Sequence, residues 1–460
     1  MSNRDFALGP RRADDGTCLP FCGIVCYNLP MRVLDTRSSR PEELARFLVK
    51  PLLQDNPEVE EAVRRILADV RERGDAAVLE YVRRFDWPEA DSLVVPDEAI
   101  EQAYSQVSDS LLAAVRTAKS NIECFHRKQL RTSWMDADEK GKVLGQVVRP
   151  LERVGILAPA FQAPLPSSLV MAAIPAKVAG VRELFVSTPP RKDGSIHPVM
   201  AVAAAESGVD RIFRIGGAHG VAALAYGTET VPRVDKIAGP GGVYVTMAKR
   251  LVFGRVGIDM LAGPSEVLVL ADDTANPRYV AADLLSQAEH DTDARAILIT
   301  PSRKLAQEVN AEVERQLQKL SRKTIAQASL DGNGAIIVTA SLDEAVELAN
   351  RAAPEHLELA VAEPMPFLDL IENAGAILLG EYSTEPMGDY VAGPNHILPT
   401  SGTARFSSPL SVDDFLKKSS VIMYSRESLE ADGPAAIELA EAEGLDAHAN
   451  AVRARIEGME

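Results

Sequence analysis

Residues 174–217, IPAKVAGVRELFVSTPPRKDGSIHPVMAVAAAESGVDRIFRIGG, decide the fold class of this chain. The segment at 174–180 has a helical pattern, ELFVST at 183–188 has the apolar texture of a strand, and the alanine-rich segment at 198–207 predicts another helix. RIFRI at 211–215 predicts a second strand, which ends at two glycines. Short strands that alternate with helices are typical of a parallel sheet with crossover helices. The stretch therefore predicts an α/β fold.

The same alternation continues on both sides of this stretch. Upstream, 143–159 contains VGILAPA, which has the pattern of a buried strand. Before it, 56–85 and 97–128 are helical, because apolar residues recur at steps of three and four. Downstream, strands are expected at 267–270, 296–300, 335–338 and 376–379, and helices at 276–290, 304–321 and 342–352.

We predict two Rossmann-like, incomplete parallel-sheet modules followed by a small helical tail. The expected parts are a disordered leader at 1–30, a first module with N-terminal helices at 31–135 and 265–410, a second module at 136–264, and a dimerisation tail at 411–460.

The composition indicates a globular enzyme. The 460 residues are 46% hydrophobic, and the net charge of −17 argues against nucleic-acid binding, which needs clustered basic residues. No apolar run is long enough to span a bilayer, so no membrane partner is expected. Three of the four cysteines, Cys18, Cys22 and Cys26, lie in the leader. A disulfide scaffold is thereby excluded, and the cytoplasm is the expected compartment.

Two short segments carry candidate chemistry, although each also has an ordinary interpretation. In SQAEHD, Gln287 and His290 lie three residues apart on an expected helix, within reach of one ion. A helical histidine is more often a plain surface or core residue. In APEHLEL, Glu355 and His356 follow a proline, and an acid beside a base suits proton transfer. The alternative is that both side chains lie in solvent on a loop and have no chemical role.

Three further segments are weaker still. In GDYVAGPNH, Asp389 and His396 are candidate metal ligands among glycines, although His396 could simply hydrogen-bond the turn. Glu443 and His448 lie in the polar tail and resemble an ordinary helix start. His219 follows a glycine pair at a strand end, where ligands bind in α/β sheets. The nearest match to a dinucleotide motif, GPGGVY at 239–244, lacks the third glycine. The residues alone thus indicate only an α/β metalloenzyme candidate.

Five segments together resemble the histidinol dehydrogenase family. They are GIDMLAGPSEVLVLAD (257–272), DLLSQAEHD (283–291), APEHLEL (353–359), GDYVAGPNHILPTSGTARF (388–406) and EGLDAHANAV (443–452). They occur in the family's order, and the similarity covers nearly the whole chain after Met31. One such motif would be weak evidence, whereas five in order are highly specific.

The resemblance implies a reaction and a set of site residues. The reaction is the zinc-dependent, NAD-linked, four-electron oxidation of L-histidinol to L-histidine via L-histidinal. The implied zinc ligands, one ion per subunit, are Gln287, His290, Asp389 and His448. His356 is the implied base and Glu355 the group that activates water. The implied substrate contacts are these four ligands with Ser265, His356 and Glu443.

The resemblance also implies a homodimer in which the tail of each chain completes the partner's active site. Glu443 and His448 would then reach the site from the other subunit. The expected partners are thus a small-molecule substrate and a second copy of the chain.

Three positions that concern NAD depart from the family pattern. Leu157 stands where the family usually has a tyrosine, His219 where it has glutamine, and Gly242 where it has asparagine. The Val-Pro-Gly-Gly that usually follows the tyrosine is replaced by Ala-Pro-Ala-Phe at 158–161. Either NAD binds through altered contacts, or the chemistry has drifted. The alternatives are a paralogue that oxidises another amino or sulfonated alcohol, a non-redox zinc enzyme such as a hydrolase, and a non-catalytic binding protein.

Overall fold

The computed structural model describes residues 31–48, 56–160 and 163–458. The predicted disordered leader at 1–30, with its three cysteines, lies outside the described residues. Within the described part of the chain, no helix is long and apolar enough to cross a membrane.

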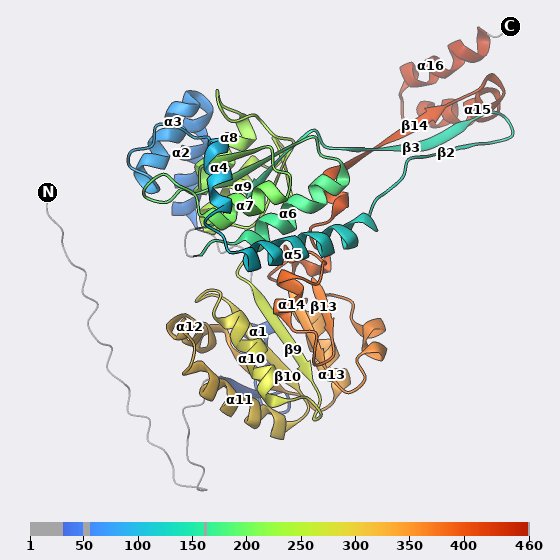
Figure 1. Ribbon diagram of the computed structural model, residues 1–460. Helices are drawn as coiled ribbons and strands as arrows, with labels where there is room; N and C mark the ends of the chain where they lie inside the picture. The colour runs from blue at the N-terminus through green and yellow to red at the C-terminus, as the bar shows by residue number, and fades with distance from the viewer. Residues whose placement is uncertain (1–30, 49–55, 161–162, 459–460) are drawn as a thin grey trace.

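The first module is built on a six-stranded parallel sheet (Figure 1). In sheet order its strands are β1 (Arg32–Asp35), β11 (Ala335–Val338), β10 (Arg295–Thr300), β9 (Glu266–Ala271), β12 (His356–Ala360) and β13 (Ala376–Leu379). Every residue of β9, β10 and β11 is buried, because helices cover both faces. Those helices are α1 (Pro41–Leu48), α10 (Pro277–Ala288), α11 (Arg303–Leu317), α12 (Lys323–Asn333) and α13 (Leu342–Ala352). Burial on both faces explains the unbroken apolar runs in the sequence.

The second module contains a five-stranded parallel sheet. Its order is β6 (Arg211–Arg214), β5 (Glu183–Thr188), β4 (Arg153–Leu157), β7 (Lys236–Ala238) and β8 (Gly257–Ile258). The helices that connect these strands are α6 (Pro166–Ala179), α7 (Pro198–Glu206), α8 (Gly217–Tyr226) and α9 (Val243–Val252). The chain order reverses between β4 and β7, as in mononucleotide-binding halves of Rossmann folds. The prediction of two parallel-sheet modules is confirmed.

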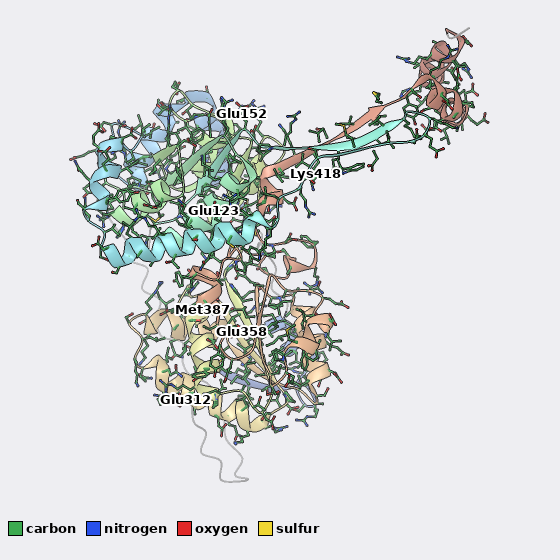
Figure 2. All side chains as sticks on the ribbon, turned by 45° about the vertical axis from the view of Figure 1, so that its right-hand side comes forward. Glu123, Glu152, Glu312, Glu358, Met387 and Lys418 are labelled. Carbon is green, nitrogen blue, oxygen red and sulfur yellow. The ribbon has the colours of Figure 1, made fainter. Side chains whose placement is uncertain are left out.

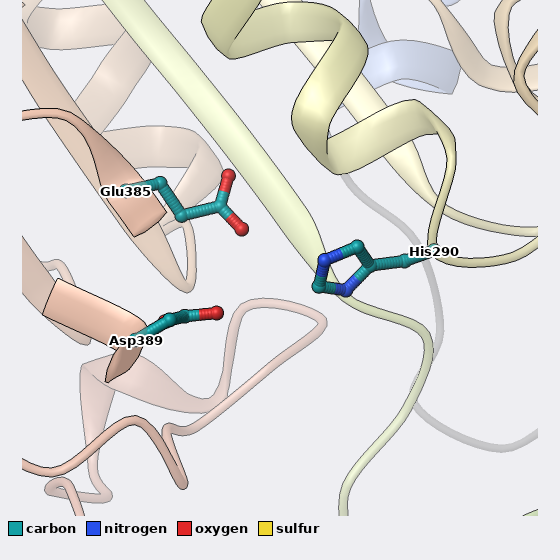
Figure 3. Close-up of side chains that lie close together, drawn as sticks. All are labelled: His290, Glu385 and Asp389. Carbon is teal, nitrogen blue, oxygen red and sulfur yellow. The ribbon is translucent and has the colours of Figure 1, made fainter. Parts of the chain in front are cut away.

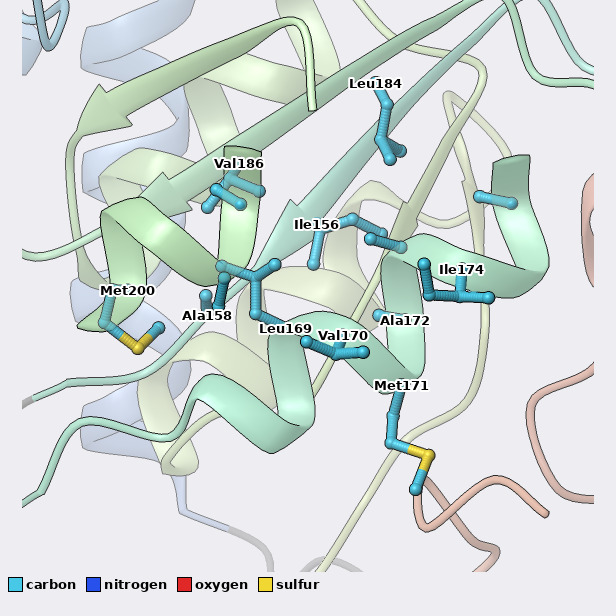
Figure 4. Packing of buried hydrophobic residues seen from close by; sticks show 14 of the residues in the cluster. Ile156, Ala158, Leu169, Val170, Met171, Ala172, Ile174, Leu184, Val186 and Met200 are labelled. Atoms are coloured by element: carbon cyan, nitrogen blue, oxygen red, sulfur yellow. The ribbon is translucent and has the colours of Figure 1, made fainter. Parts of the chain in front are cut away.

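Small apolar side chains fill the core of the second module. Figure 4 shows α6 packed on β4 and β5 through Leu169, Ile156 and Val186, whereas Met171 points to the opposite side of the helix. Almost every residue of α6 is buried, so this helix is apolar on all sides. Such a helix has no amphipathic stripe, so in the sequence it is recognised only by its continuous apolar run.

The N-terminal helices were expected with the first module, and this expectation was wrong. They are α2 (Pro57–Arg73), α3 (Asp75–Phe85), α4 (Asp97–Tyr104) and α5 (Asp109–Arg127). The apolar stripe of α2, including Val63 and Val70, packs with α8 and α9 of the second module. A helical repeat specifies a buried face but not the sheet that covers it. Gly74, at φ +57°, separates α2 from α3 within a stretch whose sequence has the pattern of one helix.

A long arm extends from the second module and carries the C-terminal helices (Figure 1). It is a three-stranded antiparallel sheet of β2 (Trp134–Ala137), β3 (Val143–Pro150) and β14 (Leu416–Met423), with α15 (Arg426–Ala442) and α16 (Asp446–Glu457) at its far end. Figure 2 shows the arm again, with Lys418 near its start. The tail at 411–460 is therefore not purely helical, and β2 and β3 belong to the arm instead of the second module's sheet. Most of β14 is exposed, so it lacks the apolar alternation that predicts a strand.

Candidate metal and catalytic site

The candidate site lies at the amino-terminal edge of the first sheet. His356 is the first residue of β12, and Glu266 is the first residue of the neighbouring β9. Gln287 lies in the last turn of α10, His290 follows that helix by two residues, and Asp389 lies in α14 (Glu385–Tyr390). Ligands in open α/β sheets usually bind at the carboxyl edge of the strands. Topology alone would therefore have placed this site at the wrong edge.

The side-chain amide of Gln287 is buried without a hydrogen-bond partner among the described residues. It is fully buried, and among the described residues neither its Oε1 nor its Nε2 has a hydrogen-bond partner. A buried amide without partners costs about 1–3 kcal/mol, so natural proteins rarely leave one. A metal ion bound to Oε1 would compensate that cost.

Three metal-binding side chains meet near the end of α10, where His290 follows Gln287 by three residues. Donor atoms of His290, Glu385 and Asp389 all lie within 4.8 Å of one another, and Figure 3 shows the two carboxylates pointing toward the imidazole. An imidazole with carboxylates is a donor set that zinc accepts. His290 is exposed in this single chain, so the site is open on one side. Glu385 was missed in the sequence, although its spacing of four residues before Asp389 places both on one helix face.

His356 is held so that one ring nitrogen remains available. Its Nδ1 lies 3.2 Å from the carbonyl oxygen of Glu266, which can only accept a hydrogen bond, so Nδ1 carries a proton. Its Nε2 lies 3.4 Å from Oδ1 of Asp389 and has no hydrogen-bond partner among the described residues. Burial opposes the charged form, but the carboxylates of Glu355 and Asp389 outweigh it and raise the pKa of His356 to about 10. A cation bound to Asp389 would offset this negative charge and favour the neutral imidazole that a base needs.

Glu355 is a buried carboxyl beside this imidazole. Its Oε2 accepts a hydrogen bond of 2.8 Å from the backbone N–H of Glu266 and lies 3.8 Å from Nδ1 of His356. Burial raises the pKa of Glu355 to about 8, although the nearby His356 works in the opposite direction. A carboxyl group with a pKa in this range can both give and take a proton near neutral pH. The pair is therefore suited to acid–base chemistry.

The structure brings together most of the site residues proposed from the sequence, but not all of them. Gln287, His290, Glu355, His356 and Asp389 gather at one edge, and Ser265 directly precedes Glu266 there. Glu443 ends α15 and His448 lies in α16, at the far end of the arm (Figure 1). In one chain, these two residues are away from the site.

His396 could be a metal ligand or could hydrogen-bond the turn, and the structure shows the second arrangement. Its Nδ1 donates to the carbonyl oxygen of Asp389 at 2.8 Å, and its Nε2 accepts from the Ser168 hydroxyl at 3.1 Å. Both ring nitrogens are engaged, so His396 supports the backbone that carries Asp389.

The three positions assigned to NAD differ in exposure. Leu157 is buried in the core of the second module. His219, in the first turn of α8, is also buried, with its ring against Tyr81 and Phe85 and its Nε2 3.6 Å from Asp86. Gly242 is exposed at the N-terminus of α9, and no described atom lies within 4 Å of the place that a Cβ would take. Only the third position is open to a ligand.

The loop that contains Gly242 has features of a phosphate-binding turn. It follows β7 at the point where the strand order reverses, and no side chain caps the N-terminus of α9. Uncapped N–H groups at a helix N-terminus attract anions. Lys249 and Asp259, a buried ion pair, hold the loop from inside, because Lys249 donates to the Gly239 carbonyl and Asp259 accepts from the Gly239 N–H. The backbone here would attract an anionic group, whereas the side chains of Leu157 and His219 are buried.

Replacing Gly239 with alanine should destabilise the protein by about 2 kcal/mol. Gly239 has φ +113°, and a Cβ there would lie 2.3 Å from the backbone oxygen of Leu157. Urea unfolding would measure the loss of stability. Gly242→Ala is the matched control, because φ is −67° and a Cβ there would have no described atom within 4 Å; an equal loss of stability in both variants would contradict the explanation.

The fold and the site together define a class: two-module α/β enzymes in which a buried acid–base pair adjoins a cluster of metal donors. Comparison with known proteins narrows this class. The family model for histidinol dehydrogenase matches residues 51–456, and the chain belongs to this family.

Individual relatives agree over nearly the full length. The chain is 54% identical to the histidinol dehydrogenase of Heliobacterium mobile, over 89% of this chain and 96% of that protein. It is 55% identical to the one of Geobacter sulfurreducens, over 93% and 100% respectively. The crystal structure of histidinol dehydrogenase from Elizabethkingia anophelis superimposes with a TM-score of 0.89 at 38% identity, covering 94% of this chain and 99% of that one.

Proposed function

We propose that this chain catalyses the zinc-dependent, NAD-linked oxidation of L-histidinol through L-histidinal to L-histidine, the last step of histidine biosynthesis. Membership of the histidinol dehydrogenase family supports the reaction. The observation that carries the metal assignment is the buried amide of Gln287, which has no hydrogen-bond partner among the described residues and lies three residues before His290 of the donor cluster.

Gln287, His290, Asp389 and His448 of the partner subunit would hold the zinc. Zinc supplies Lewis-acid polarisation of the alcohol oxygen and orientation of the amino alcohol. Glu385, within 4.8 Å of two of these ligands, adds negative charge that compensates the cation. Ser265 and Glu443 of the partner subunit are proposed as further substrate contacts.

His356 would remove the proton of the alcohol. Its Nδ1–H is fixed on the Glu266 carbonyl, so Nε2 is the atom that takes the proton. Glu355 would then take a proton from the water that adds to the aldehyde. NAD would supply the hydride acceptor at both the alcohol and the hydrated-aldehyde stage, so each histidinol would consume two NAD and one water. The loop at 239–242 and the N-terminus of α9 would hold the dinucleotide.

A homodimer with shared sites accompanies this proposal. The arm extends α15 and α16 away from the modules of its own chain (Figure 1), and His290 is exposed in the single chain. An arm of this form can place Glu443 and His448 in the open side of a partner's site. We also propose the cytoplasm as the compartment, since Cys124, the single cysteine among the described residues, is free.

One observation favours a second candidate, a zinc enzyme with non-redox chemistry. The side chains of Leu157 and His219, at two of the three positions assigned to NAD, are buried in the core. Incubating the purified protein with zinc, NAD and histidinol, and following the absorbance of reduced NAD, separates the two candidates. Steady reduction supports the dehydrogenase. No reduction by zinc-loaded protein, with no NAD binding in calorimetry, would favour the second candidate.

Removal of the metal should abolish the activity and leave the fold intact. Since the ligands surround a site at the sheet edge, a chelator should lower kcat by about 100-fold or more, and added zinc should restore it. Circular dichroism should change little, because the apolar cores on both faces of the first sheet are formed without the ligands. Unchanged activity in protein shown by elemental analysis to be metal-free would contradict the role of zinc.

A further inference from the structure

Glu266 is a buried carboxylate that takes no part in the proposed reaction. It is 2% exposed and begins β9, the strand that lies between β10 and β12 in the first sheet. A charged group in such a place is costly unless it is paired and hydrogen-bonded. Its contacts therefore indicate what it does.

The backbone of Glu266 contacts both members of the acid–base pair. Its N–H donates to Oε2 of Glu355 at 2.8 Å, and its carbonyl oxygen accepts from Nδ1 of His356 at 3.2 Å. These two hydrogen bonds orient the carboxyl group and select the ring nitrogen that carries a proton. The position of the Glu266 backbone thus determines the positions of both side chains.

The side chain of Glu266 ties the same backbone to two neighbouring segments. Its Oε1 accepts from the N–H groups of Glu355 at 3.3 Å and Ser401 at 3.0 Å. Ser401 has φ +55°, a left-handed conformation that costs a non-glycine residue about 1 kcal/mol and persists where neighbours hold it. Thr400, next to it, accepts from the N–H of Gly263, two residues before Ser265. The Glu266 carboxylate therefore connects the backbone at Glu355 with Ser401. Through Thr400, the same segment is connected with the backbone around 263.

Arg295 completes this arrangement. Its Nη2 is paired with Oε2 of Glu266, and its Nη1 donates to the Phe47 carbonyl at 2.9 Å. Arg295 and Glu266 are direct partners in the β9–β10 register, and both side chains are buried. The arginine occupies one oxygen of the carboxylate, so the other oxygen is left to the two backbone N–H groups.

We propose that Glu266, with Arg295, is a positioning residue that holds Glu355, His356 and the loop at 400–402 in their catalytic arrangement. The inference rests on the proposed function, because it needs Glu355 and His356 to be the catalytic pair. A carboxylate is required at 266, because every contact that its side chain makes here is to a donor. An amide has an NH2 group in place of one carboxylate oxygen. This NH2 group would face either Arg295 or the backbone N–H groups, which are themselves donors.

Glu266→Gln should therefore lower kcat by about 100-fold, with KM within about threefold and zinc still bound at one ion per subunit. Glu266→Gln combined with Arg295→Gln should recover about tenfold of this loss, because the second amide can accept from the first across the register pair. A kcat of Glu266→Gln within about threefold of the parent protein would overturn the proposal. So would a double variant that is no better than the single one.

Asn310→Ala is the matched control for lost stability. Asn310 is a fully buried polar residue of the first module, and its amide holds the backbone of Met31 instead of the acid–base pair. It should lower the unfolding midpoint in urea as much as Glu266→Gln while kcat stays within about twofold. An equal fall in kcat in the two variants would mean that stability, not positioning, explains the result.

Failure of the proposed function has a different signature. If the parent protein oxidises no histidinol, amide hydrogen exchange at 354–356 and 400–402 tests the positioning role directly. Faster exchange in Glu266→Gln than in both the parent protein and Asn310→Ala would support it, since the N–H groups of Glu355 and Ser401 donate to the Glu266 carboxylate. Unchanged exchange at these segments would overturn it.

Discussion

His356→Asn should lower kcat by about 1000-fold while zinc remains bound. In the parent protein, Nε2 of His356 has no hydrogen-bond partner among the described residues and is the atom proposed to take the alcohol proton. The asparagine amide cannot take a proton at neutral pH, but it is similar in size and polarity to the imidazole. The structure places the metal donors on other segments, so the metal content measured by elemental analysis should stay at one ion per subunit.

His197→Asn is the matched control for this substitution. His197 is the N-cap of α7 in the second module, and its ring accepts from the N–H of Val199. Asparagine is among the favoured N-cap residues, so the helix should keep its cap and kcat should stay within about twofold. Loss of zinc from His356→Asn would contradict the role of His356 as a base and make it a metal ligand instead.

Mixing chains that carry Gln287→Ala with chains that carry His448→Ala should restore activity that neither variant has alone. Each variant by itself should lose about 100-fold or more, because one zinc ligand is missing from every site. In a mixed dimer with exchanged arms, one of the two sites receives an intact Gln287 from one chain and an intact His448 from the other. Random pairing makes half of the dimers mixed, so activity should return to about a quarter of that of the parent protein.

The alternative to exchanged arms predicts a different result. If each chain folded its own arm back onto its own site, every site in a mixed dimer would carry one defect, and activity would not return. Differently tagged chains, purified for mixed dimers, ensure that the pairing is known. The absence of rescue in such dimers would contradict the shared site.

Much of the sheet structure could be predicted because parallel strands are buried on both faces. The runs at 183–188, 335–338 and 376–379 coincide with β5, β11 and β13, since apolar segments of this length bounded by turn residues leave little choice. The N-terminal helices were assigned to the wrong module, because Val63 and Val70 mark a buried face without naming its partner. β14 escaped prediction because its polar residues (417–420) and its apolar residues (421–423) stand in blocks and do not alternate, and pairing with β3 makes this largely exposed segment a strand.

The site was less accessible to pattern reasoning than the fold. The spacing of Gln287 and His290 suggested one ion, but no local rule joined them to Asp389, which is about 100 residues away along the chain and meets them only through the packing of α14 beside α10. The resemblance to the family supplied that link. The contacts of Glu266 could not be predicted in any such way, because its role lies in hydrogen bonds to the backbone of Glu355 and Ser401.

The ratio of reduced NAD to histidine formed is the measurement that tests the central claim most directly. Zinc-loaded protein would be given a limiting amount of histidinol with excess NAD, and absorbance and amino-acid chromatography would count the two products. The four-electron reaction at the pair of Glu355 and His356 predicts two reduced NAD for each histidine, with no free aldehyde accumulating. A ratio of one with released aldehyde, or no reduced NAD from protein that holds its zinc, would contradict the account.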